Sequence, residues 1–451
     1  LHPNVFSPIE EIPHDDFEGI EDINNYLLQH PEVKDYLAAR KPGQKAGTAM
    51  FLLFDKQTDK LAKKVGVEIM FPSAKMRTFM DNKVNTNRIA EKAGVPCVPY
   101  VLSPVADYKH LREVSKHLGE ELVIQTPFGD SGHTTFFISN EEEFKKYEDE
   151  IIKEGEVKIM KRINCRGSAV EACVTRHGTI VAPLMTELVG FKDLTPYQGG
   201  WCGNEIYPNA FTPKLRRQAR EYTQLFGNQL REEGYKGYFE LDFLIDQDSG
   251  EIYLGELNPR VTGASSITNH AVFALADAPL FILHILEWMN VEYDLNIKEI
   301  NKRWSKQENI DSWSQLIIKH TEDTIEYVEE APRSGIWKMF DNGHIQFDRM
   351  DTHRRAVESE GEAFFLRISR KGDYLYEGAD MGILVSRGRM MTDDFKLTKR
   401  AKDWKTALPN KYSSKVVEDK SKHLALKGSL IKEFHRISQF NSYYKCTDCV
   451  T

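Results

Sequence analysis

The stretch FELDFLIDQDSGEIYLGELNPR, residues 239–260, sets acidic side chains into two otherwise apolar runs. Successive side chains of a β-strand point to opposite faces. The first run therefore places Glu240 and Asp242 on the face opposite its apolar side chains, which are Phe239, Leu241, Phe243 and Ile245. The segment DQDSG (246–250) between the runs has the composition of a turn. The stretch predicts an antiparallel hairpin.

The second run, residues 252–258, adds further polar groups to this hairpin. Strict alternation predicts that one face of this strand carries Ile252, Leu254, Glu256 and Asn258. Acids from both strands then lie on one side of the hairpin. A surface hairpin with solvated acids is the plain alternative, but converging carboxylates are also the ligands that a hard divalent cation prefers.

Length and composition indicate a soluble globular protein of several structural units. The chain has 451 residues, a net charge of −8, 41% hydrophobic residues and 28% charged residues. The acidic balance argues against a nucleic-acid partner. No apolar run reaches the roughly 20 residues that span a bilayer, and the first residues show no secretory signal. We therefore expect a cytoplasmic protein with no membrane partner.

The six cysteines give no strong metal-binding pattern. Only Cys446 and Cys449 form a C-x-x-C, and no second pair completes a zinc site. Unpaired cytosolic thiols or a peripheral tail are the expected reading.

Hydrophobic patterning predicts an α/β (α+β) chain with a texture that changes near residue 300. Short alternating runs separated by Gly and Asp follow that point and predict a small β-rich region. The more specific predictions are a buried strand at Ala49–Phe54 and helices at Lys83–Ala93, within 141–154, at 213–233 and at 276–289.

Four segments, in this order and spacing, resemble the ATP-grasp superfamily of ADP-forming ligases. In sequence, these segments are most similar to the biotin-carboxylase-like branch. The segments are DNKVNTNRIAEKAGVPCVPY (81–100), LVIQTPFGDSGHTTFFI (122–138), KIMKRINCRGSAVEACV (158–174) and the hairpin 239–260. The resemblance covers about residues 80–275. It implies an ATP-grasp fold with an N-terminal α/β domain (1–81), an ATP-grasp domain (82–300) whose small lid spans about 100–190, and a C-terminal β-rich domain with a tail (301–451).

The resemblance assigns metal and substrate roles to the end of the hairpin. It implies Mg²⁺, with Mn²⁺ as an alternative ion, held by Asp242, Glu256 and Asn258. Arg260 occupies the position where a guanidinium can meet an acyl phosphate or a carboxylate. Glu240 has no assured family role and could bind metal, a lysine or substrate.

The resemblance also implies a set of nucleotide-binding residues. Lys83 matches a phosphate-contacting lysine, although an exposed helix lysine is the alternative. The glycine-containing loop at 129–134 could bring backbone N–H groups to phosphates, or it could be an ordinary β-turn. The hinge at 158–163 would present backbone groups to adenine. The implied residues are Gly129, Ser131, Gly132, His133 and Thr134 in the loop, Lys161, Arg162 and Ile163 in the hinge, and Glu171 on the next strand.

One position departs from the family pattern. The strand before the loop usually carries a second ATP-binding lysine, and this chain has Gln125 there. Gln125 can hydrogen-bond phosphate or adenine but brings no charge. The missing charge is expected from His133, Lys161 or Arg162.

Three functions remain open from the sequence. The first is an ADP-forming carboxylate–amine ligase that works through an acyl phosphate on small-molecule acid and amine substrates, with a homodimer considered. The run NPRVTGAS (258–265) favours it, because it resembles a substrate-pocket loop of peptide-forming members. A biotin carboxylase is the alternative, although VTGASS (261–266) replaces the residues which that chemistry needs. A nucleotide-binding regulatory protein without turnover is the third.

Overall fold

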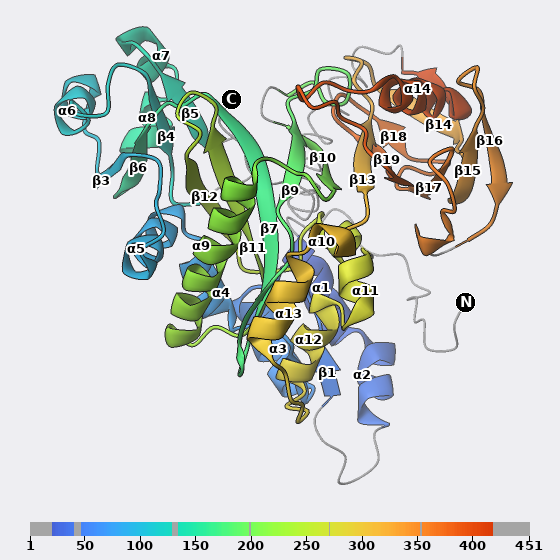
Figure 1. Ribbon diagram of the computed structural model, residues 1–451, viewed down its shortest axis with the longest axis horizontal. Coiled ribbons are helices and arrows are strands. Elements are labelled where there is room, and N and C mark those ends of the chain that lie inside the picture. The colour runs from blue at the N-terminus through green and yellow to red at the C-terminus, as the bar shows by residue number, and fades with distance from the viewer. Residues whose placement is uncertain are drawn as a thin grey trace.

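The computed structural model describes residues 20–39, 47–128, 134–197, 200–269, 271–351 and 354–417. Figure 1 shows a long central sheet, a smaller sheet at the upper left and the C-terminal strands at the upper right. Helices and strands mix throughout the described residues, so the expected α/β (α+β) class is confirmed. Cys446, Cys449 and the C-terminal tail lie outside the described residues.

The described residues of the N-terminal part form four helices and a two-stranded parallel sheet. These elements are α1 (Ile20–Gln29), α2 (Pro31–Ala38), β1 (Gly47–Ala49), α3 (Lys56–Lys64), β2 (Val67–Ile69) and α4 (Ala74–Asp81). The predicted strand at Ala49–Phe54 is wrong, because strand structure ends at Ala49. Its partner β2 has only three residues, and the Asp55 side chain already caps α3 by accepting a hydrogen bond from Thr58 N (2.7 Å).

The smaller sheet is antiparallel, in the order β3-β6-β4-β5, and α6 to α8 lie beside it (Figure 1). One side of this sheet packs on these helices through an apolar core that includes Leu122 and Ile159. The other side faces the hairpin. The elements are β3 (Tyr100–Ser103), α6 (Tyr108–Val114), β4 (Leu122–Gln125), β5 (Thr135–Ile138), α7 (Glu141–Lys145), α8 (Glu148–Ile152) and β6 (Val157–Lys161).

The single helix expected within 141–154 is wrong, because the chain forms the two short helices α7 and α8. Both first turns consist of acids only, Glu141–Glu143 and Glu148–Glu150. Negative side chains are stabilised near a helix N-terminus and repel one another along a continuous helix face. Breaking the helix gives each acidic group its own N-terminus.

The large sheet runs in the order β12-β11-β7-β9-β10-β13-β19-β17-β15-β16, with β8 paired to β7. Its first strands are β7 (Cys165–Thr175), β8 (Gly178–Val181), β9 (Met185–Val189), β10 (Trp201–Ile206), β11 (Gly237–Asp246) and β12 (Ile252–Asn258). One face packs on α5 (Lys83–Ala93) and α9 (Pro213–Glu232) through the core that contains Phe239, Leu241 and Phe243. The helices expected at 83–93 and 213–233 are confirmed.

Shorter helices follow the hairpin, at α10 (Ser265–Thr268), α11 (Val272–Ala276), α12 (Leu280–Trp288) and α13 (Ile297–Trp304). The helix expected over 276–289 begins only at Leu280. Pro279 occupies its N-cap, and a proline disfavours the helical conformation of the residue before it.

The hairpin contains a bulge that sequence alternation does not predict. Asp242 lies opposite Glu256 and Phe243 lies opposite Leu254, which leaves Gly255 as the extra residue. Leu254 therefore faces the apolar core while Glu256 faces the other way with Asp242. The predicted common face for Leu254 and Glu256 is wrong, but the acids of both strands still share one side.

The C-terminal strands continue the large sheet, because β13 pairs with β10. A second, three-stranded sheet has the order β18-β14-β20, and α14 packs in the same region. The elements are β13 (Trp313–Lys319), β14 (Glu326–Glu330), β15 (Gly335–Met339), β16 (Ile345–Arg349), β17 (Glu362–Arg367), β18 (Tyr374–Leu375), β19 (Asp380–Arg387), α14 (Lys399–Ala407) and β20 (Ser413–Val416), with 3-10 turns at Gln307–Asn309, Arg354–Ala356 and Pro409–Lys411. The boundaries at 81 and 300 stay predictions.

We predict that Gly203→Ala severely destabilises the junction of β10 and β13. Gly203 has a φ of +139°, and a Cβ there would lie 1.8 Å from the backbone oxygen of Gln315. The substitution should lower the free energy of unfolding by about 3 kcal/mol or more in urea titrations. Gly372→Ala is the matched control, since Gly372 has a φ of +96° but no atom within 4 Å of a Cβ. It should cost about 1 kcal/mol. Equal losses for both variants would contradict the close approach.

Candidate nucleotide and metal site

Lys83 is the first residue of α5 and points into the protein. Its side chain is 3% exposed, and Nζ lies 3.3 Å from Glu256 Oε1. The backbone explains this placement, since Asn82 caps the helix and Lys83 N donates to Pro127 O (2.9 Å). Lys83 is therefore no exposed helix lysine. Removing two charges from water is costly unless they are paired, so Lys83 and Glu256 hold each other in place.

Strand pairing brings the predicted metal ligands together. Asp242 lies opposite Glu256, and Glu240 lies opposite Asn258. Asn258 Nδ2 donates to Asp242 Oδ2 (3.0 Å) and lies 3.5 Å from Glu240 Oε1. Arg260 Nη1 donates to Asn258 Oδ1 (2.5 Å). Glu240, Asp242, Glu256 and Asn258 form a polar cluster, in which the three residues other than Glu256 are nearly buried, as is Arg260.

The chemistry of these donors fits Mg²⁺ in part. Asp242, Glu256 and Asn258 supply hard oxygen atoms, and Glu256 Oε2 is buried without a hydrogen-bond partner among the described residues. Asn258 Oδ1 already accepts from Arg260, so only its second lone pair is left for a metal. Within the described ranges, no group of three or more His, Cys, Asp or Glu has a metal-binding arrangement. Two carboxylates and one amide are the set that the chain offers.

Glu171 and Glu240 hold the loop that follows the hairpin. They are directly opposite each other on β7 and β11. Thr262 Oγ1 donates to Glu240 Oε2 (2.6 Å) and lies 3.2 Å from Glu171 Oε1, which also accepts from Ser265 Oγ. Both carboxyl groups are buried, and each accepts a hydrogen bond from the loop. The nucleotide role implied for Glu171 stays a prediction.

Burial raises the pKa of both carboxyl groups. The pKa of Glu171 rises to about 6, although hydrogen bonds from Ser265 and other residues oppose the change. The pKa of Glu240 is raised well above its ordinary value, by burial first and then by the neighbouring charge of Glu171. Two buried acids this close favour a state in which one proton is retained.

Gln125 ends β4 on the side of the small sheet that faces the hairpin. It is 6% exposed, and its Nε2 donates to Thr135 Oγ1 (3.2 Å). Its cross-strand partner on β6 is Lys158, whose Nζ donates to Gly255 O (3.3 Å). Burial, and to a smaller extent the charge of Lys83, lowers the pKa of Lys158 to about 8, while Cys97 and Glu256 oppose this change.

Two residues near the polar cluster have no counterpart in the sequence predictions. One is Lys158. The other is Asp81, at the end of α4, which feels the charges of Arg260, Arg77 and Glu256. Neither residue could be assigned to the site from its local sequence, because a lone acid at a helix end and a lone lysine in a strand are ordinary surface residues in most proteins.

The hinge residues line a separate cavity of about 550 Å³. Lys161, Arg162 and Ile163 form one wall, and Asp246, Asp248 and Ser249 of the hairpin turn form another. Lys161 is exposed and lies on the side of β6 away from Gln125. Arg162 stacks over Phe137, with its Cζ 5.4 Å from the ring centroid. The cavity shares no lining residue with the Lys83–Glu256 pair.

Most of the predicted phosphate loop lies outside the described residues, namely Gly129, Ser131, Gly132 and His133. Thr134 is described, and its carbonyl accepts from Thr126 N (3.2 Å). The described ends of the loop continue directly into β4 and β5, which bear Gln125 and Thr135.

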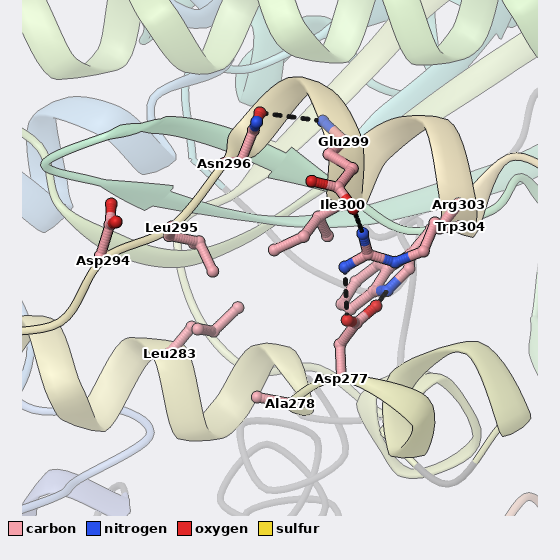
Figure 2. Close-up of a pocket in the computed structure, with 10 residues that line it drawn as sticks. All are labelled: Asp277, Ala278, Leu283, Asp294, Leu295, Asn296, Glu299, Ile300, Arg303 and Trp304. Carbon is pink, nitrogen blue, oxygen red and sulfur yellow. Dashed lines mark hydrogen bonds and ion pairs between the residues drawn. The ribbon is translucent and has the colours of Figure 1, made fainter.

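A second pocket, of about 400 Å³, lies between α12 and α13 (Figure 2). Its carboxylate Asp277 is already paired, with Arg303 Nη2 at 2.6 Å and Trp304 Nε1 at 2.8 Å. Glu299 also accepts from Arg303 (2.5 Å). These contacts pair Asp277, Glu299 and Arg303 with one another, which leaves Asp294 as the remaining charged residue of the lining.

In sequence, the chain is distantly similar to known carboxylases and ligases. No family model matches the chain. It is 23% identical over 227 residues to the 2-oxoglutarate carboxylase small subunit of Hydrogenobacter thermophilus, which is 48% of this chain and 46% of that one. It is 22% identical over 206 residues to the D-alanine–D-alanine ligase of Clostridium novyi, which is 44% of this chain and 59% of that one. The match thus spans about half the length of these curated relatives.

A solved structure gives the same result for the fold. The biotin carboxylase domain dimer of the Hydrogenobacter thermophilus 2-oxoglutarate carboxylase, in complex with MgADP, ADP and bicarbonate, superposes with a TM-score of 0.56 at 15% identity. The superposition covers 92% of this chain and 85% of that chain. The predicted resemblance to the ATP-grasp superfamily is confirmed, and the chain has the ATP-grasp fold. Its curated relatives and structural neighbours are enzymes of this superfamily, which bears out the expectation of an enzyme, while the ADP-forming, C–N bond-forming activity stays a proposal.

The described helices include none that is both long and apolar enough to cross a bilayer.

We predict that Glu171 makes the stability of the protein fall with rising pH. Its folded pKa of about 6 exceeds the ordinary 4.5, so the folded state binds more protons between these values. Across that window the stabilisation is lost, by at most about 2 kcal/mol. Glu171→Gln keeps the acceptor oxygen without the titration. In urea unfolding, the stability of Glu171→Gln relative to wild type should therefore rise from pH 4.5 to 6. A difference that stays constant over this range would refute the assignment.

Proposed function

We propose that the protein is an ADP-forming carboxylate–amine ligase. The observation that carries this proposal is the buried Lys83–Glu256 pair beside Asp242, Asn258 and Arg260. The cluster joins cations that suit phosphate groups to oxygen ligands that suit Mg²⁺. A purely structural hairpin would have no need of so many buried charges.

In the proposed reaction, a substrate carboxylate oxygen attacks the γ-phosphorus of ATP and ADP leaves. An amine nitrogen then attacks the acyl carbon of the resulting acyl phosphate, inorganic phosphate leaves, and the nitrogen loses a proton. Lys83 would bind the nucleotide phosphates, and Arg260 would orient the substrate carboxylate or acyl phosphate. Positioning and charge neutralisation are the main contributions a protein makes to phosphoryl transfer.

Asp242, Glu256 and Asn258 are the residues that would hold Mg²⁺. When bound, the ion would neutralise charge that develops on the phosphate oxygens. The structure of the neighbour from Hydrogenobacter thermophilus contains MgADP, which supports this choice of ion. Mn²⁺ remains an alternative of the same hard-ligand class.

The loop Thr262–Ser266 supports a ligase in particular. Glu171 and Glu240 fix its start, and Gln315 Nε2 donates to Gly263 O (2.9 Å) on its other side. A short loop held from both sides next to Arg260 is suited to shape an acceptor pocket. Small-molecule acid and amine substrates remain part of the proposal.

A bicarbonate-dependent carboxylase is the second candidate. It is favoured by the superposition on a biotin carboxylase domain, which extends over 92% of this chain and so includes the C-terminal strands. That neighbour is described as a dimer, so a homodimer is proposed with this candidate too. ATP turnover that requires bicarbonate and rises with free biotin would select the carboxylase, whereas turnover that requires an amine would select the ligase.

The cytoplasmic location also stays a proposal. It is supported by Cys97, Cys173 and Cys202, which are free thiols among the described residues.

Glu256→Gln tests the proposed chemistry. The change preserves shape but removes one of two carboxylate charges, so ADP release with MgATP and pooled acids and amines should fall by orders of magnitude. The free energy of unfolding should fall by as much as about 3 kcal/mol, because the buried Lys83 loses its ionic partner, so ADP release is compared under conditions in which both proteins stay folded. Glu251→Gln is the matched control, because Glu251 lies on the same hairpin, is 47% exposed and pairs with Lys214. Near-normal ADP release from Glu256→Gln, or loss through unfolding, would refute the proposal.

Lys83→Met should act on nucleotide binding. The substitution keeps a long apolar stem but removes the ammonium group, so the Kd for MgATP should rise at least about tenfold. Mg²⁺ affinity should change little. Calorimetric titration of both ligands measures this separation. If wild type binds MgATP but releases no ADP with any substrate pool, a regulatory nucleotide-binding protein is the better description.

A further inference from the structure

Lys158 is a buried cation on the side of the small sheet that meets the hairpin. Its side chain lies on β6 and is 1% exposed. Nζ donates to Gly255 O at 3.3 Å, and this acceptor is a neutral carbonyl. Burying a charged ammonium group is costly unless ionic partners compensate. A lysine in this position therefore needs a reason beyond packing.

The strand register gives that reason. Lys158 is the direct cross-strand partner of Gln125, so both side chains project from the same face of the small sheet. Met160 and Val123 pair two residues further along and share that face, where they pack in an apolar cluster with Leu244 of the hairpin. The face thus has an apolar half and a polar half, and Gln125 and Lys158 form the polar half.

Lys158 also lies beside the other charged groups of the site. Its contact, Gly255, is the extra residue of the hairpin bulge, and the next residue, Glu256, pairs with Lys83. The two lysines come from separate elements, α5 and β6, and converge on adjacent residues of β12. Two cations on either side of one bulge form a place where a polyphosphate chain can be held.

We infer that Lys158 supplies the phosphate-binding charge that Gln125 lacks, so that the second cation of the nucleotide site comes from β6 in place of β4. This inference rests on the proposed function. It also replaces the expectation that Lys161 carries this charge, since Lys161 is exposed on the other side of β6. The ligand is a nucleoside di- or triphosphate, and the group recognised is its phosphate chain.

The test compares MgATP, MgADP and adenosine by calorimetric titration of the full chain. Lys158→Met should weaken MgATP and MgADP binding about 10- to 100-fold, as expected for a charged hydrogen bond. Adenosine binding should stay unchanged, because adenosine has no phosphate. The melting temperature should not fall, since a buried charge is replaced by an apolar side chain of similar length. Lys153→Met, an exposed lysine of the same small domain, is the matched control.

A charge exchange tests the site from the other strand. In Gln125→Lys/Lys158→Gln the lysine moves to the directly opposite position, and most of the MgATP affinity should return. Unchanged MgATP affinity in Lys158→Met would overturn the inference. An equal loss of adenosine affinity in this variant would also overturn it. So would a double variant that melts like wild type but does not regain MgATP affinity. A wild-type protein that does not bind MgATP would overturn the proposed function as well, whereas wild-type binding that Lys158→Met leaves intact would overturn this inference alone.

Discussion

One extra residue in β12 decides which way the acids of the hairpin face. Without Gly255 as a bulge, strict alternation would put Glu256 on the same side as Leu254, in the apolar core against α5 and α9. With it, Glu256 meets Asp242, and Lys83 reaches Glu256 from the end of α5. The position is narrow for any other residue, because a Cβ on Gly255 would lie 3.2 Å from Asp242 O. The electrostatic features of the site therefore depend on the backbone geometry at a single glycine.

Around this bulge, the sheet supplies mainly anions and the surrounding elements supply cations. Asp242, Glu240 and Glu171 lie on adjacent strands, while Lys83 comes from a helix and Lys158 from the small sheet. Charges on separate elements can be neutralised only when those elements pack together. The apolar cluster around Leu244 and Met160 provides that packing, since it joins the small sheet to the hairpin.

Much of this arrangement could be predicted from the sequence, because alternation with period two is a local signal. It located the hairpin and placed Glu240 and Asp242 opposite the apolar face. The bulge was missed because it breaks that period. Leu254 and Leu257 both face the core although they are three residues apart, and this odd spacing is the sequence feature that indicates the bulge. The role of Lys158 was missed because it depends on the cross-strand partner Gln125. The sequence of neither segment predicts which distant strand it pairs with.

The two helix predictions that failed did so for similar reasons of context. Pro279 shortened a helix that hydrophobicity alone extended to residue 276, and two acidic groups divided another. The strand predicted at Ala49–Phe54 was misplaced, because the real strand pairs with the three residues of β2 and ends at Ala49. The local pattern was thus right about the element type for the two helical segments and wrong for residues 50–54.

The pairing of β10 with β13 has a consequence for any shortened form of the chain. All six residues of β10 are buried, and the edge of this strand bonds to β13 over four residue pairs. A chain ending before Trp313 would leave that edge open, with unpaired N–H and C=O groups beside apolar side chains. Open edges of this kind pair with other chains and lead to aggregation. The C-terminal strands thus act as a protective cover that keeps the sheet behind the site from joining its own copies.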